Sequence, residues 1–206
     1  GSIGYTTNKS GDETNANNVL SKYTNKGRNF NISPSFGHFF SDNLAIGIGL
    51  GYNNSRYTSH NNSFYNDLSS VSSRIEKLEN FNIGPFVRYY VDITHEFKFF
   101  GQLNTAIGFG NGNTSGNETS YYLTNPNTPT QSVDFDRDYK STTYGASINP
   151  GFAFFPSKRW AIEFSFPLVN YSKTKPKEDN LYIQETENFS FATSSFNPTI
   201  GVNFHF

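Results

Sequence analysis

The sequence predicts an all-β fold: an eight-stranded antiparallel up-and-down transmembrane β-barrel that forms a single domain over residues 1–206. Three observations predict it. Apolar residues alternate with Gly, Asn, Ser and Thr at period 2 along most of the chain, whereas helical periodicity is hard to find. The alternating segments number eight, the even count that a closed up-and-down sheet needs. The connections between them alternate between short and long, as in barrels that cross a membrane.

The composition excludes several classes of protein. Aromatic residues make up 17% of the chain, with 22 Phe and 13 Tyr, which is far too many for a disordered segment. The net charge is −1 and the basic residues do not cluster in the sequence, so we expect no nucleic-acid partner. The absence of Cys excludes disulfides, thiol catalysis and Cys-ligated metals. No stretch approaches the roughly 18 apolar residues of a membrane helix.

The first two expected strands are "GSIGYTT" at the start of the chain and "NFNISPSFGHFF" at 29–40. The third, "LAIGIGLGY", is the clearest, because Leu44, Ile46, Ile48, Leu50 and Tyr52 share one face and small residues share the other. The same alternation predicts the remaining five strands, at 81–91, 97–109, 144–154, 160–168 and 194–206.

The expected connections sort by length. Three are short, at 41–43, 92–96 and 156–159. Four are long and rich in Asn, Ser, Thr, Gly and Lys, so we expect external loops near 8–28, 54–73, 111–138 and 172–188. Soluble hairpin proteins have no reason to sort connections in this way, so the asymmetry favours a membrane barrel.

An internal repeat places one proline in each even-numbered strand, within the related segments "NISPSFGHFF", "NIGPFVRYYV", "INPGFAFFP" and "FNPTIGVNFHF". Four hairpins of about fifty residues each therefore make up the chain. Proline has no N–H to give to the sheet, so Pro34, Pro85, Pro150 and Pro198 are expected at bulges or at missing ladder bonds.

The apolar faces are predicted to point outward into lipid. The interior of an eight-stranded barrel is just wide enough to be filled by side chains, and the Gly-rich faces suit that space better than the Phe-rich faces. The alternative, a soluble barrel with an apolar interior, would leave the Gly-rich polar faces as its surface. Aromatic residues at the two margins are expected to form girdles, comprising Phe39, Tyr89, Phe154 and Trp160 at the short-turn end and Tyr52 and Tyr144 at the other.

Eight alternating strands, sorted connections and the ending "GVNFHF" resemble the small outer-membrane β-barrel family of OmpA/OmpX type. The Asn, Phe and Tyr usage and the repeated proline motif more specifically resemble the outer membrane protein β-barrel domain common in Bacteroidota. The resemblance implies a location in the bacterial outer membrane of a Gram-negative cell, contact with outer-membrane lipids and lipopolysaccharide, and insertion by the barrel-assembly machinery. It also implies that Phe206, Phe204 and Val202 belong to the insertion signal. "GSIGYTTNKS" lacks the features of a signal peptide, so we expect a mature or trimmed chain.

Three inward-facing charges are the first candidates for a functional site. Arg88, Lys98 and Glu163 all lie within a few residues of short turns and are expected at similar height inside the barrel. Because buried charges must be paired, we predict that Glu163 lies within salt-bridge distance of Arg88 or Lys98. The cluster is interpreted as a structural plug, with a gate or narrow conduction path as the alternative.

Catalytic and metal-binding patterns are weak. The four His residues lack metal-ligand spacing, and only His60 is placed near the outer rim, in the polar segment "TSHNNS". We therefore expect no enzymatic activity, no metal and no cofactor. Asp134, Asp136 and Asp138 share one face of "DFDRDY", which reads as a solvated edge, with weak divalent-cation binding as the alternative.

Two functions remain open at this point. One is a structural or partner-binding barrel, such as an adhesion protein or an accessory subunit of another outer-membrane protein, acting through its long outer loops or its lateral wall. The other is a narrow, porin-like channel or carrier for ions or small hydrophobic molecules.

Overall fold

The computed structural model describes residues 2–16, 19–65, 68–122, 129–157, 159–177, 184–191 and 199–204. It contains eleven β-strands in one antiparallel sheet. No helix in these ranges is long and apolar enough to cross a membrane. The strands are β1 (Ser2–Ala16), β2 (Val19–Ser33), β3 (Ser35–Ser41), β4 (Leu44–Tyr65), β5 (Leu68–Asp92), β6 (Phe97–Tyr122), β7 (Pro129–Ser157), β8 (Trp160–Ser165), β9 (Val169–Pro176), β10 (Thr186–Phe191) and β11 (Thr199–Phe204).

The strand order is β1-β2-β4-β5-β6-β7-β8-β11, with β3 beside β4 and β9 between β7 and β10. The all-β antiparallel class is therefore confirmed, but the strand count is eleven and not eight. The expected strand at 29–40 is divided at Pro34 into β2 and β3, which both pair with β4. The other two additional strands, β9 and β10, lie outside the expected strands at 160–168 and 194–206; β9 pairs with β7 and with β10. The chain still crosses the sheet in eight consecutive antiparallel passes.

The predicted closure of the sheet is not seen in the described part of the chain. "GSIGYTT" was expected to pair with the C-terminal strand, but β1 pairs with β2 alone and β11 with β8 alone. The register explains this, because Ser2 lies opposite Ser33 and β1 therefore runs beside the outer part of the second pass. The edge of β3 away from β4 has no partner strand within these ranges. Pro198 and Phe206 lie outside the described residues.

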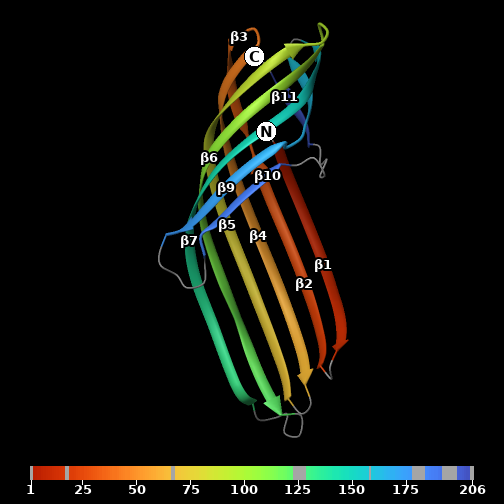
Figure 1. The fold of residues 1–206 in the computed structure, drawn as a ribbon, viewed down its shortest axis with the longest axis vertical. Helices are drawn as coiled ribbons and strands as arrows, with labels where there is room; N and C mark the ends of the chain where they lie inside the picture. The colour runs from red at the N-terminus through yellow and green to blue at the C-terminus, as the bar shows by residue number, and fades with distance from the viewer. Residues whose placement is uncertain are drawn as a thin grey trace.

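The long connections predicted as loops are for the most part strands. β4, β5, β6 and β7 contain 22, 25, 26 and 29 residues, whereas about 10 residues suffice to span a membrane. Residues 8–16 and 19–28 belong to β1 and β2 in the same way. Figure 1 shows the result: β1, β2 and β4 to β7 run on together as a long sheet, while β3 and β11 lie at the opposite end.

Polar cross-strand contacts explain why Asn-, Ser- and Thr-rich segments form strands here. Within the expected loop at 111–138, the Asn113 amide donates to Asp136 at 2.7 Å, and the hydroxyls of Thr119 and Ser132 lie 3.3 Å apart. Such pairs stabilise a sheet without an apolar face. The residue types that predicted loops are therefore the ones that hold the extended sheet together.

Irregular pairing is present at each of the three described repeat prolines, as predicted. Pro34 separates β2 from β3. At Pro85 the ladder between β5 and β6 skips from Ile83 to Phe86. Pro150 lies where the strand beside β7 is interrupted at 166–168, between β8 and β9, whose registers on β7 differ by one residue. The missing proline N–H accounts for the position of these breaks.

The two faces of the sheet follow the predicted assignment. Ala45, Tyr90, Phe100 and Ala153 form a buried cluster on the inner face, with Phe155 packed against it. The outward apolar residues of the same strands are exposed, as with Ile46 at 43% and Leu103 at 49%. One margin residue is corrected: Phe39 does not join the girdle at the short-turn end, because its ring stacks on the inward Tyr90 at a centroid distance of 5.6 Å.

Candidate functional site

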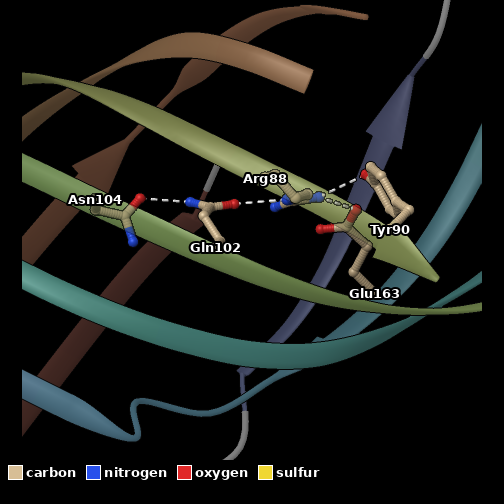
Figure 2. Close-up of polar contacts among 5 residues, drawn as sticks. All are labelled: Arg88, Tyr90, Gln102, Asn104 and Glu163. Atoms are coloured by element: carbon tan, nitrogen blue, oxygen red, sulfur yellow. Dashed lines mark hydrogen bonds and ion pairs between the residues drawn. The ribbon is translucent and has the colours of Figure 1, made fainter. Parts of the chain in front are cut away.

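The inner face carries an ion pair between Arg88 on β5 and Glu163 on β8. Arg88 Nη1 donates to Glu163 Oε1, and the two side chains are 14% and 9% exposed (Figure 2). The two strands are separated by β6 and β7 in the sheet, so the contact crosses the interior and does not follow a strand ladder. The predicted contact between Glu163 and Arg88 is confirmed.

Arg88 has two further partners that fix its guanidinium. Its Nη1 also donates to the hydroxyl of Tyr90 at 3.0 Å, and its Nε donates to Gln102 Oε1 at 2.6 Å. Charge-assisted hydrogen bonds of this kind are stronger than neutral ones, and several of them restrict the side chain to one orientation. The cation is thus held by a carboxylate, a phenol and an amide at once.

The polar contacts continue along the inner face away from the ion pair. Gln102 Nε2 donates to Asn104 Oδ1, and Asn104 Nδ2 donates to Ser147 Oγ at 3.2 Å. Figure 2 shows the line of side chains from Glu163 through Arg88 and Gln102 to Asn104. Since the residues come from β5, β6, β7 and β8, this chain links four strands through their side chains.

An aromatic ring covers the guanidinium. The Phe100 ring lies 4.3 Å from Arg88 Cζ and is 1% exposed. A Cβ at Gly151 would lie 2.5 Å from Phe100 Cζ and 2.5 Å from the Phe164 carbonyl oxygen, so only Gly leaves room for the ring at this position. Phe100 thus removes water from one side of Arg88 and strengthens its attraction to Glu163.

Lys98 does not join this cluster. Its Nζ contacts Asp92 Oδ1 at 2.8 Å, and Asp92 is the residue directly opposite it on β5. A carboxylate one strand away is reached at less cost than Glu163, which is two strands away on the other side of Ala153. The sequence placed all three charges at similar height but could not show which cation the carboxylate would take.

The predicted girdle residues face outward. Tyr89, Phe154 and Trp160 at the short-turn end and Tyr52 and Tyr144 at the other end are each 37–55% exposed. Val202 and Phe204 of the expected insertion signal are also outward and exposed, and Phe204 packs against Trp160 with ring centroids 4.9 Å apart. Phe206 is outside the described residues. The role of these residues in insertion stays a prediction.

Sequence reasoning missed three members of the inner cluster. From the sequence, no role is assigned to Tyr90, Gln102 or Phe100. The usable signal was period 2: Lys98, Phe100, Gln102 and Asn104 alternate with outward residues and therefore share the inner face with Arg88.

The outer carboxylates have protein partners. The Asn113 amide donates to Asp136 at 2.7 Å and to Asp138 at 2.8 Å. Asp136 and Asp138 therefore share the Asn113 amide as a hydrogen-bond donor. The residues that the structure describes contain no group of three or more His, Asp or Glu side chains placed to hold a metal ion.

The sequence profile of the family described as outer membrane protein beta-barrel domain matches residues 1–168. No curated protein sequence matches the chain. Among solved structures, one similar chain is from the RagAB peptide importer, with 11% identity, 82% of this chain and 19% of that chain covered, and a TM-score of 0.38. Another is the siderophore receptor PiuA from Acinetobacter baumannii, with 14% identity, 90% of this chain and 30% of that chain covered, and a TM-score of 0.36. A third is Ail, the attachment invasion locus protein of Yersinia pestis, with 16% identity, 98% of this chain and 93% of that chain covered, and a TM-score of 0.28. The chain spans less than a third of the length of the first two.

Proposed function

Since the chain belongs to the family of outer membrane protein beta-barrel domains and is located in the bacterial outer membrane, we propose that it is a partner-binding protein that acts through the sheet extending beyond its membrane wall. The observation that carries the proposal is the length of the strands. β4 continues from Tyr52 at the outer girdle to Tyr65, and β7 continues from Tyr144 back to Pro129. At about 3.3 Å per residue, these extensions continue for about 43 Å and about 50 Å along the strands past the aromatic row.

The chemistry of the extension suits a binding surface. Within residues 53–63 of β4 every side chain but Tyr57 is a polar or charged Asn, Ser, Arg, Thr or His. The outer edge of β1 has no partner strand in the described ranges, nor does the edge of β7 over residues 129–139. Unpaired strand edges can accept an extended peptide as an added strand. The extension therefore offers two faces and two edges to a macromolecular partner.

The interior of the wall argues against the alternative of a channel or carrier. Arg88, Glu163, Tyr90 and Phe100 meet across it, and Gln102 and Asn104 occupy the next positions along the inner face. An ion would have to displace a buried ion pair to pass, which is costly in a low-dielectric interior. We propose accordingly that the cluster is a structural plug and that the protein is not an enzyme.

The proposal is tested by shortening the extension while keeping the wall. Thr58 and Ile75 are directly opposite, so replacing residues 59–74 with Asn-Gly joins them through a two-residue hairpin. A photo-crosslinking residue at position 62 or 117 of the full-length chain is expected to capture a defined partner in native membranes, and the same residue at position 94, in a short turn, is expected not to.

Two results together would contradict the proposal. One is the absence of any extension-specific crosslink, and the other is a unitary conductance of the wild-type chain in planar bilayers. Loss of the crosslink from position 117, which the shortened chain retains, with the wall still resistant to unfolding in detergent, supports it.

A further inference from the structure

Five basic residues that are dispersed in the sequence meet on the outward face of β1, β2, β4 and β5. Arg28 lies directly opposite Arg56, and Arg56 directly opposite Lys77. Lys9 lies directly opposite Lys26 in the next outward row, two residues farther along each strand. Residues opposite one another in an antiparallel sheet point to the same face. Lys9, Lys26, Arg28, Arg56 and Lys77, together the basic patch, therefore share one surface.

The patch is unfavourable without an anion. Like charges directly opposite one another destabilise a sheet. Within the ranges that the structure describes, no ion pair joins any of the five cations to a carboxylate. Glu79, the acidic residue on the same face of β5, instead accepts hydrogen bonds from the Asn54 amide at 3.0 Å and the Tyr52 hydroxyl at 3.4 Å. Three cations therefore lie side by side, while the adjacent carboxylate of Glu79 is hydrogen-bonded to Asn54 and Tyr52.

A hollow of about 420 Å³ lies at the centre of the patch. Its lining includes the side chains of Lys9, Lys26, Arg28 and Arg56 and those of Thr7 and Thr58. Two guanidinium groups can each offer a fork of N–H donors, and the two Thr hydroxyls add weaker donors. This is the donor set that phosphate oxygens require.

The height of the patch identifies the source of the anion. Tyr5, Phe30 and Tyr52 are exposed aromatic residues on the same outward face. The next outward position beyond Tyr5 on β1 is Thr7, and the next beyond Phe30 on β2 is Arg28. On β4, Arg56 lies two outward positions, or four residues, beyond Tyr52. Because aromatic girdles mark the membrane interface, the patch lies at the level of the lipid head groups and faces them.

Three further lysines lie near the same height elsewhere on the wall. On β7 and β9, Lys140 and Lys175 lie on the face that carries Tyr144, within four residues of its row. Lys177 Nζ lies 5.6 Å from the centroid of the outward Phe109 ring. A soluble anion would need only one pocket, whereas lipid head groups surround the wall at one height. Lysines near this height on strands outside the basic patch therefore favour a lipid as the source of the anion.

We propose that the basic patch binds the phosphate groups of a phosphorylated glycolipid in the outer leaflet, with Arg28 and Arg56 as the principal ligands. This inference rests on the outer-membrane location and does not depend on a protein partner for the extension. Binding phosphate would remove the repulsion between the opposed cations and fix the depth of the wall in the membrane.

The test is lipid binding by the full chain refolded in detergent micelles, with native mass spectrometry to count bound lipid. The probes are bisphosphorylated lipid A, the same lipid with both phosphates removed, and inorganic phosphate as competitor. The variant is Arg28→Gln/Arg56→Gln. The matched control is Lys22→Gln/Arg74→Gln, which also removes two positive charges but takes them from cations already paired with Glu13 and Glu76. Arg28→Lys/Arg56→Lys shows whether charge alone suffices.

Wild type and the control are expected to bind bisphosphorylated lipid A with equal affinity, and the Arg28→Gln/Arg56→Gln variant at least about tenfold more weakly. The dephosphorylated lipid is expected to bind as weakly to wild type as the phosphorylated lipid binds to that variant. Equal binding by wild type and the Gln variant, or equal loss in the control, overturns the proposal.

Competition by inorganic phosphate at the concentration at which the lipid binds would assign the site to a free anion and overturn the lipid source. A second copy of the chain covering the patch would also overturn the proposal. It would appear in the mass spectra as a dimer that is lost on Arg28→Gln/Arg56→Gln or on substitution of Asp136 and Asp138. Arg28→Lys/Arg56→Lys is expected to bind the lipid within about threefold of wild type. If it binds as weakly as a folded Arg28→Gln/Arg56→Gln chain, the guanidinium forks are essential for binding.

Discussion

Arg88 and Glu163 are 75 residues apart in the sequence and meet inside the wall, where Arg88 also holds Tyr90 and Gln102. This contact ties β5 to β8 across two intervening strands. A buried pair contributes most visibly when one partner is removed, because the remaining charge is then left without a counter-ion.

Glu163→Leu is therefore expected to lower the free energy of unfolding by about 3–5 kcal/mol, since it leaves Arg88 unpaired. The double variant Arg88→Met/Glu163→Leu is expected to recover most of that loss. The measurement is equilibrium urea unfolding in lipid vesicles, followed by Trp160 fluorescence.

Asp92→Ala is the matched control for this pair. It breaks the ion pair between Lys98 and the 58%-exposed Asp92 side chain, and its cost is expected to stay below about 1 kcal/mol. A Glu163→Leu chain as stable as Asp92→Ala would show that the interior ion pair has no structural role.

Gly151→Ala is expected to destabilise the wall by about 1–3 kcal/mol, because the new Cβ would meet the Phe100 ring and the Phe164 carbonyl oxygen at 2.5 Å. Phe100 cannot move aside without uncovering Arg88. The measurement is again urea unfolding in vesicles.

Gly101→Ala provides the comparison, because a Cβ at Gly101 has no heavy atom within 4 Å. Its effect is expected to stay within about 1 kcal/mol of wild type. If the two variants were equally stable, the packing of Phe100 over Gly151 would be wrong.

Acid is expected to loosen the pairing of β10 with β9. The hydrogen bond from Lys173 lowers the pKa of Glu185, which precedes β10. A carboxyl whose pKa is lowered on folding adds stability above its unfolded value of about 4.3, and that stability is lost as the pH falls through the folded pKa. Amide exchange over Thr186–Phe191, corrected for the intrinsic rate, should therefore be less protected at pH 3 than at pH 6.

Glu185→Gln removes the titrating group and should abolish this difference. Protection of β10 that is the same at both pH values in the wild-type chain would mean that the contact between Lys173 and Glu185 does not hold the strand.

Period 2 was enough to predict the antiparallel class, the outward apolar face and a contact of Glu163 with either Arg88 or Lys98, of which the structure shows Arg88. Period 2 failed where turns and strands are both rich in Asn, Ser and Thr. Asn, Ser and Thr mark turns in short connections, but in the long ones they pair across strands, as Thr119 does with Ser132, so expected loops became the extension.

Two other features depend on register, which a single sequence does not reveal. The basic patch exists because Arg28, Arg56 and Lys77 fall in one row, although 28 and 21 residues separate them along the chain. The expected closure between "GSIGYTT" and the C-terminal strand is not seen in the described ranges, because Ser2 lies opposite Ser33, so β1 begins beside the outer part of the second pass, whereas β11 pairs with β8 near the short turns.

Trp160 offers the most direct test of the central claim, that the apolar face of this sheet is immersed in lipid. It is the single Trp of the chain, it faces outward, and it is 48% exposed beside Phe204. The measurement is quenching of its fluorescence by phospholipids brominated at different depths along the acyl chain. A second chain, Trp160→Phe/Leu103→Trp, moves the reporter to the middle of the wall, where Leu103 is 49% exposed.

We expect Trp160 to be quenched most strongly by bromine near the head group and the reporter at position 103 most strongly by bromine deeper in the acyl chain. Strong quenching by aqueous iodide with no quenching by any brominated lipid, at both positions, would contradict the account, because the apolar face would then not be in the membrane.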